Sequence, residues 1–147
     1  MNKFLDRNNI NTILDKNKKI VFTNGCFDIL HRGHVEYLKK AREYGDLLFI
    51  GLNSDSSVRK LKGDSRPINN EIDRATVLAS LECVSYVSIF NEDTPLELIK
   101  IIKPDVLVKG GDYKLEEVIG REYAKETILI DFVYGYSTTN IINKINS

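Results

Sequence analysis

The chain has 147 residues, 42% of them hydrophobic, and its 21 Lys and Arg residues balance its 21 Asp and Glu residues. This length suits one globular domain over residues 1–147, and a net charge of zero gives no basic excess for holding nucleic acid regardless of its sequence. No apolar run approaches the roughly 20 residues that cross a bilayer, and the first residues lack the apolar segment of a secretion signal, so we expect a cytoplasmic protein without a membrane or nucleic-acid partner.

Short apolar runs recur along the chain at intervals that predict a sheet. They lie at residues 20–22, 47–50, 84–90, 106–108 and 128–130. Runs so little broken by polar residues are typical of strands buried on both faces, as in parallel sheets. Helical spacing between them, as at Val35, Leu38 and Ala41, makes strand and helix alternate. The pattern predicts an α/β fold with a doubly wound parallel five-stranded sheet, whose ligand site lies at the carboxyl ends of the strands.

Two further helices are expected near the ends of the sequence. One is a short helix over residues 8–16, packed on the sheet, and the other is a closing helix over residues 137–145.

The segment that follows the first strand has the features of a phosphate site. Gly25 comes directly after the strand and Gly33 stands where a helix opens, so backbone N–H groups can approach an anion without an intervening side chain. The spacing is neither the G-x-G-x-x-G of dinucleotide folds nor that of a P-loop. We therefore predict a different phosphate site, with these nucleotide-binding candidates: Thr23, Asn24, Gly25, Phe27, Asp28 and Gly33.

His31 and His34 are the only histidines in the chain and are three residues apart. If the helix has begun at His31, both side chains project from one face and can reach the same phosphate group. The alternative is that His31 only caps the helix and His34 is a surface residue. A zinc site is disfavoured because no Cys, His or carboxylate set accompanies the pair.

At this point the sequence resembles the HxGH nucleotidyltransferases. Gly25-x-Phe27-Asp28 followed by His31-x-Gly33-His34 is similar to their signature, and the similarity runs from about residue 20 to residue 145. Four later blocks resemble the branch of heptose 1-phosphate adenylyltransferase domains, which are often fused behind a sugar kinase; they are residues 61–67, 92–99, 109–113 and 135–139. The resemblance implies a Rossmann-like fold of the nucleotidyltransferase type.

Lys62 stands in a segment where Gly63, Asp64 and Pro67 disfavour regular structure and other cationic side chains gather. We expect a mobile arm that brings Lys62 onto the triphosphate, where its charge offsets the negative charge that develops in the transition state. The alternative is a solvated charged loop. Arg74, at the start of the next helix, is placed near the nucleotide phosphates by the resemblance. A surface salt bridge is the other interpretation of Arg74.

The block at residues 109–113 follows a buried strand, where this fold places ligands. Its glycines permit a tight turn that reads a base edge, with Lys109 and Gly110 at the site and Asp112 fixing the turn or binding ribose; a plain turn is the alternative. Ser137 and Thr138 resemble a helix start that caps itself and takes a phosphate on its N–H groups, although capping alone would also explain them.

The resemblance implies transfer of the adenylyl group of ATP to a sugar 1-phosphate with release of pyrophosphate. His31 and His34 would donate to phosphate oxygens, Lys62 would offset charge, and Mg²⁺ would be held mainly by the phosphates, because the chain shows no dedicated carboxylate cluster. Asp28 would position a histidine or the water shell of the ion. Single-domain relatives imply a homodimer, with any sugar kinase on a separate protein.

Three other functions stay open on the sequence alone. A cytidylyltransferase acting on glycerol 3-phosphate or another polyol or sugar phosphate belongs to the same superfamily, but that type carries Arg-Thr-Glu where this chain has Phe132, Val133 and Tyr134. A nucleotide-binding module without catalysis and a structural scaffold are the others. Cys26 and Cys83 are expected to be free thiols that pack rather than react.

Overall fold

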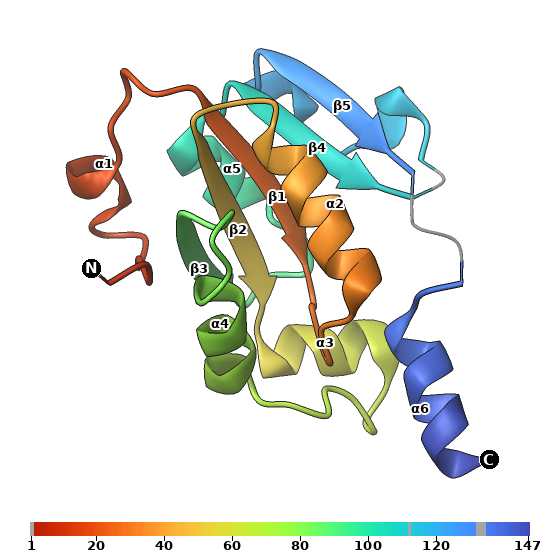
Figure 1. The fold of residues 1–147 in the computed structure, drawn as a ribbon. Helices are drawn as coiled ribbons and strands as arrows, with labels where there is room; N and C mark the ends of the chain where they lie inside the picture. Colours follow the sequence, from red (N-terminus) through yellow and green to blue (C-terminus); the bar gives the residue numbers. More distant parts are fainter. Residues whose placement is uncertain (1, 112, 132–134) are drawn as a thin grey trace.

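The apolar runs pair into a single parallel sheet in the computed structural model, which describes residues 2–111, 113–131 and 135–147. The strands lie in the order β3-β2-β1-β4-β5 (Figure 1). Their bounds are β1 Ile20–Gly25, β2 Leu47–Asn53, β3 Tyr86–Phe90, β4 Val106–Gly110 and β5 Glu126–Ile130. The sheet confirms the Rossmann-like five-stranded fold, and because the order reverses after β3, the switch point lies between β1 and β4.

The helices alternate with the strands as the sequence predicts. They are α1 Ile10–Ile13, α2 Arg32–Arg42, α3 Asp55–Lys62, α4 Glu71–Ala79, α5 Leu96–Ile102 and α6 Thr138–Asn146, with 3₁₀ turns η1 Leu115–Glu117 and η2 Arg121–Tyr123. The closing helix α6 is shifted by one residue from its predicted bounds.

The first helix is much shorter than the predicted span of residues 8–16. It ends before Asp15, whose backbone carbonyl accepts from the N–H of Lys18 and whose side chain accepts from the N–H of Asn17. This local turn competes with a continued helix for the same backbone groups. α1 lies against α5, and its Ile10 joins the apolar layer that contains Ile20 and Phe22 of β1.

The strands β1 and β2 run three residues beyond the apolar runs that predict them. Asn24 pairs with Gly51 and Gly25 with Leu52 in the parallel ladder. Polar residues and glycine continue the ladder because its hydrogen bonds join backbone groups and do not need apolar side chains. The predicted phosphate turn therefore starts from the end of a strand rather than from a loop.

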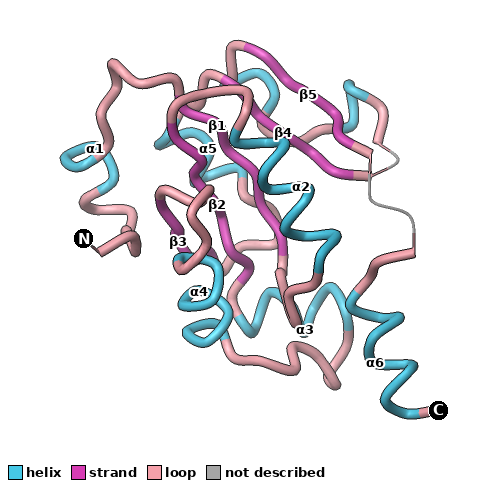
Figure 2. The backbone as a smooth tube through the Cα atoms, in the orientation of Figure 1, coloured by secondary structure: helices cyan, strands magenta, loops and turns pink. Residues whose placement is uncertain are grey.

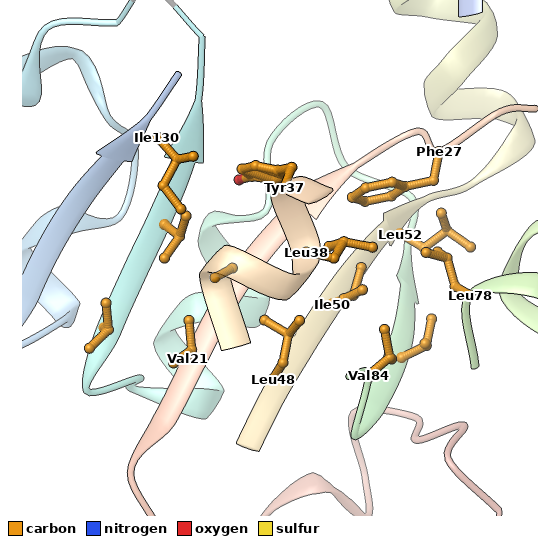
Figure 3. Packing of buried hydrophobic residues seen from close by; sticks show 14 of the residues in the cluster. Val21, Phe27, Tyr37, Leu38, Leu48, Ile50, Leu52, Leu78, Val84 and Ile130 are labelled. Carbon is orange, nitrogen blue, oxygen red and sulfur yellow. The ribbon is translucent and has the colours of Figure 1, made fainter. Parts of the chain in front are cut away.

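Two apolar layers cover the sheet, one on each face. Side chains alternate along β1, so Val21 packs with α2 and α4 on one face while Ile20 and Phe22 pack with α1 and α5 on the other. Figure 3 shows the first layer, in which Leu38 of α2 lies beside Ile50 of β2. Fully burying one such side chain stabilises the fold by about 1.5–3 kcal/mol, so this packing holds the strands and helices of the sheet together.

The helices that frame the carboxyl ends of the strands begin with polar caps. Ser54 accepts from the N–H of Ser57 at the start of α3, Asn70 from that of Asp73 before α4, and Ser137 from that of Asn140 before α6. Figures 1 and 2 show α3 and the start of α6 beyond the tips of β1 and β2. These short elements enclose the end of the sheet where the predicted motifs meet.

Candidate active site

A cavity of about 720 Å³ opens at the carboxyl ends of the strands. It gathers residues from the end of β1, the start of α2, the end of α3, the loop after β3, the end of β4 and the start of α6. The predicted site residues that line it are Asn24, Gly25, Phe27, Asp28, His31, Gly33, His34, Lys62, Lys109, Gly110, Ser137 and Thr138. Motifs that are more than 100 residues apart in the sequence thus share one cavity.

Thr23 and Arg74 lie beneath this cavity and do not line it. The hydroxyl groups of Thr23 and Tyr37 are 2.6 Å apart and form a buried hydrogen bond. Arg74 is 2% exposed, and its guanidinium donates to the backbone carbonyls of Asn69, Cys26 and Asn53 and to the Asp55 carboxylate.

Both side chains are thus committed to the protein, which places neither Thr23 nor Arg74 in contact with the cavity. The expected contact of Arg74 with nucleotide phosphates does not fit this position, because four of its five N–H groups already have partners. Asp112 and Phe132 lie outside the described residues.

The turn after β1 is held in an unusual backbone conformation. Phe27 and Ile29, on either side of Asp28, have φ angles of +47° and +53°, which residues with a side chain rarely adopt. A Cβ on Gly25 would lie 2.9 Å from the ring of Phe27, so a larger residue here would force that ring to shift. Backbone strain of this kind persists where the surroundings fix it, which is typical of ligand sites.

The two histidines form a stacked pair whose proton positions follow from the backbone. Their ring centroids are 3.8 Å apart. Nδ1 of His31 accepts from the N–H of Gly33 at 3.1 Å, and Nδ1 of His34 accepts from the N–H of His31 at 3.2 Å. A neutral imidazole whose Nδ1 accepts carries its proton on Nε2, so each ring can donate an Nε2–H to a ligand in the cavity. His31 therefore both caps α2 and presents an Nε2–H donor to the cavity. Helix capping and contact with a ligand, which the sequence alone left as alternatives, are compatible for this residue.

Burial keeps both histidines neutral at physiological pH. It lowers the pKa of His34 to about 4, with a smaller contribution from His31, and it also lowers the pKa of His31. Neutral donors suit a site that binds an already ionised phosphate without taking a proton from it.

The depressed pKa of His34 makes stability depend on pH. Because His34 takes up a proton near pH 6.5 in the unfolded chain and only near pH 4 in the folded chain, its contribution to the free energy of unfolding is constant above pH 6.5 and falls as the pH drops through this window. We expect the difference in unfolding free energy between the wild type and His34→Ala to shrink by about 1–2 kcal/mol between pH 7 and pH 5. This magnitude follows because one unit of pKa shift corresponds to about 1.4 kcal/mol. Urea unfolding of both proteins at the two pH values tests this, and an unchanged difference would contradict it.

Lys62 and Lys109 bring positive charge to the cavity wall from opposite sides. Lys62 is the last residue of α3, not a loop residue as predicted, and Gly63 follows it with a φ of +99° as the helix cap. Lys109 lies 4.7 Å from the centroid of the Tyr113 ring, and burial lowers the pKa of its ammonium group. A desolvated ammonium beside a ring face interacts strongly with any phosphate that reaches it.

The turn after β4 has less backbone to offer a base than expected. The N–H of Gly111 donates to the carbonyl of Ile130, and the N–H of Tyr113 donates to the carbonyl of Gly111. That this turn reads a base edge stays a prediction. It depends on the polar backbone groups of the turn other than the N–H groups of Gly111 and Tyr113.

The start of α6 closes the cavity over the histidines. The hydroxyl of Thr138 donates to the backbone carbonyl of Asp28 at 2.5 Å, and Ser137 caps the helix. The ring of Tyr136 stacks near that of His31, with centroids 6.3 Å apart. A Cβ on Gly33 would lie 2.8 Å from Cβ of Tyr136, which explains the glycine between the histidines.

Sequence reasoning missed Tyr37, Arg66 and Tyr136 as cavity residues. Arg66 stood in the cationic segment around Lys62, which was a usable signal. Tyr136 lies within the block 135–139, which was also a usable signal, whereas Tyr37 carries no local signal because its place depends on how α2 docks. Burial raises the pKa of Tyr37 to about 12, so its hydroxyl stays protonated beside Thr23.

Within the described residues, no three His, Cys, Asp or Glu side chains come together in a way that could hold a metal ion. Among the same residues there is no helix with the length and apolar character needed to span a membrane.

Comparison with known proteins gives a consistent result. The sequence model of the family described as cytidylyltransferase-like matches residues 22–144. The chain is 67% identical over 132 residues to the bifunctional protein HldE of a Nitratiruptor species, and 61% identical over 145 residues to that of Helicobacter hepaticus. These alignments cover 90% and 97% of this chain but only 29% and 30% of the relatives, so the chain spans about three tenths of their length.

Solved structures show the same fold. A lipopolysaccharide core biosynthesis protein from Thermoplasma volcanium matches with a TM-score of 0.65 and 27% identity, over 79% of this chain and 97% of that protein. Pantothenate synthetase from Thermus thermophilus matches with a TM-score of 0.67 but 13% identity, over 95% of this chain and 67% of that one, so it supports the fold alone.

Proposed function

The chain belongs to the cytidylyltransferase-like family of nucleotidyltransferases, and from this membership we propose that it transfers the adenylyl group of ATP to a sugar 1-phosphate. The acceptor we propose is D-glycero-D-manno-heptose 1-phosphate, which would give ADP-heptose and pyrophosphate for lipopolysaccharide core or surface polysaccharide synthesis. The motif blocks that resemble heptose 1-phosphate adenylyltransferase domains support this choice, as does the identity of 61–67% to proteins named HldE.

The stacked histidine pair is the observation that carries the proposal. Both rings are neutral and keep an Nε2–H for the cavity, because each Nδ1 is occupied by a backbone N–H. In the proposed reaction an oxygen of the sugar phosphate attacks the α-phosphorus of ATP, and the bond from that phosphorus to the bridging β-phosphate oxygen breaks. The attacking oxygen is already ionised at neutral pH, so the site needs donors and positioning and does not need a general base.

We propose that Mg²⁺ accompanies the triphosphate. The described residues form no three-ligand cluster of their own, which fits an ion held mainly by phosphate oxygens. When bound, it would neutralise negative charge on the phosphates. The chain's own part is to hold the triphosphate with the histidine donors and with Lys62.

The proposed function can be tested by measuring pyrophosphate release from each of the four nucleoside triphosphates with a panel of sugar and polyol phosphates, with and without EDTA. Rapid release that requires ATP, a heptose 1-phosphate and free Mg²⁺ is the expected result. Release only with CTP and glycerol 3-phosphate would replace the proposal with the cytidylyltransferase, and binding of ATP without release from any pair would indicate a binding module.

We expect ATP to exceed CTP by at least about tenfold in kcat/KM. Gly111 and Tyr113 already use their N–H groups within the protein, so few polar groups of the turn remain for a base. A turn with few free polar groups can match the edge of only one base. Another base would leave those polar groups without hydrogen bonds, which costs binding free energy. Steady-state rates with both nucleotides at saturating acceptor measure the ratio, and a ratio of one or below would contradict the adenylyl assignment.

A homodimer in the cytoplasm completes the proposal. Light scattering on the purified protein tests the dimer, and fractionation of cells that produce the chain tests the location.

A further inference from the structure

Asp28 holds a different set of groups from those expected of it. Its carboxylate is buried, with the residue 1% exposed, and it accepts three hydrogen bonds from the segment that follows α3. Oδ2 accepts from Nε of Arg66 at 3.2 Å and from the N–H of Ile68 at 2.7 Å, and Oδ1 accepts from the N–H of Asn69 at 3.0 Å. Neither oxygen bonds to His31 or His34, so Asp28 does not position a histidine in this structure.

The backbone around Asp28 fixes this carboxylate firmly. The left-handed residues Phe27 and Ile29 flank it, and its own carbonyl accepts from the hydroxyl of Thr138. Asp28 therefore joins three parts of the cavity wall, which are the histidine turn, residues 66–69 and the start of α6.

Arg66 is held by one edge only. Its Nε–H is used by Asp28, whereas its two terminal nitrogens form no hydrogen bond with the residues that the structure describes. The side chain is 13% exposed and lines the same cavity as the histidines and Lys62. A guanidinium fixed through Nε has its terminal fork oriented for two parallel bonds to a phosphate, which is the geometry that arginine prefers.

We propose that Arg66 is a phosphate-binding residue of this site and that Asp28 is its positioning residue. The ligand class is a phosphate group carried by either substrate, the nucleotide or the sugar phosphate. This inference rests on the proposed function only in that the cavity takes phosphate-bearing substrates. In this proposal Asp28 orients the Arg66 guanidinium, and Arg66 supplies a second positive charge to the cavity beside Lys62.

The test compares Arg66→Ala with Arg59→Ala. Arg59 lies on α3, is exposed and does not line the cavity, so its variant removes one nearby arginine charge without touching the site. ATP affinity is measured by calorimetry with Mg²⁺, and KM for the sugar phosphate by pyrophosphate release. Contact with nucleotide phosphates predicts ATP affinity at least about tenfold weaker in Arg66→Ala, the scale for a hydrogen bond to a charged group. Contact with the acceptor phosphate predicts unchanged ATP affinity and a KM at least about tenfold higher, on the same scale.

Values for Arg66→Ala within about twofold of those for Arg59→Ala in both measurements would overturn the proposal, since the loss of a bond to a charged group exceeds that margin. If the wild type released no pyrophosphate with any acceptor, the proposed function would be wrong while the proposal for Arg66 could still stand. The ATP affinity of Arg66→Ala would then decide whether Arg66 binds phosphate. Arg66→Lys keeps the charge without the fork and should recover only part of the loss, and circular dichroism melting confirms that each variant is folded.

Asp28→Asn tests the positioning role. It removes the charge that holds Nε of Arg66, so it should weaken the same parameter as Arg66→Ala. The double variant should bind the ligand no worse than Arg66→Ala alone, because in this proposal Asp28 affects ligand binding only by orienting Arg66. Losses that multiply in the double variant would show that Asp28 acts independently and would overturn its assignment.

Discussion

Replacing either His31 or His34 by alanine is expected to lower kcat by at least about a hundredfold. Each change removes one preorganised Nε2–H donor from charge that develops on the phosphates, and the loss of a single such donor typically costs about 10²–10³ in rate. Single-turnover measurement of pyrophosphate release reports the chemical step directly.

His31 also caps α2, so its alanine variant needs a matched control. His31→Ser restores a side-chain acceptor for the N–H of Gly33 and lacks the imidazole. We expect His31→Ser to recover stability in urea, by about 1 kcal/mol over His31→Ala, while its kcat stays low. Recovery of turnover along with stability would instead make capping the whole role of His31.

Lys62→Met is expected to lower kcat by about a hundredfold, which is the typical cost of losing one electrostatic contact to developing charge. The same change should weaken ATP affinity much less. Lys62 ends α3 and is exposed beside the cavity, so in the resting protein its ammonium group is well hydrated. A cation that meets the phosphates chiefly in the transition state lowers the barrier without tightening the ground state. Calorimetry for ATP and saturating rates for kcat separate the two effects.

Arg59→Ala serves as the control for Lys62 as well, since Arg59 lies one turn earlier on the same helix. Equal losses in ATP affinity and in kcat/KM with an intact kcat would make Lys62 a ground-state anchor. A Lys62→Met enzyme as active as the Arg59→Ala enzyme would show that Lys62 is only a solvated residue.

The central strands β1, β2 and β4 could be predicted from the sequence because they are buried on both faces. Runs such as 106–108 contain no polar residue, and few structures other than a central parallel strand use such a run. Their ends could not be predicted, since Asn24 and Gly25 continue β1 through backbone pairing alone. The length of α1 was overestimated because the turn at Asp15 competes for the same backbone groups.

The candidate site was predictable where a motif combines residue type with position, as in the histidines and glycines after β1. The resemblance placed Arg74 near the nucleotide phosphates but could not show that its long side chain donates to three backbone carbonyls of the protein. The sequence puts Arg66 among other basic residues and Arg74 directly after Asp73, and only the fold shows that Arg66 lines the cavity while Arg74 is buried and does not.

The hydrogen bond from Thr138 to the carbonyl of Asp28 joins residues 110 positions apart. During synthesis the amino-terminal parts of a chain leave the ribosome first and begin to fold there. The histidine turn thus emerges long before Thr138, Ser137 and Tyr136 can close the cavity above it. A ribosome-bound chain that stops short of residue 136 can form much of the sheet but lacks one wall of the nucleotide site. Competence to bind ATP should therefore arise only after residue 138 has left the ribosome, although the proposed phosphate-binding histidines emerge more than 100 residues earlier.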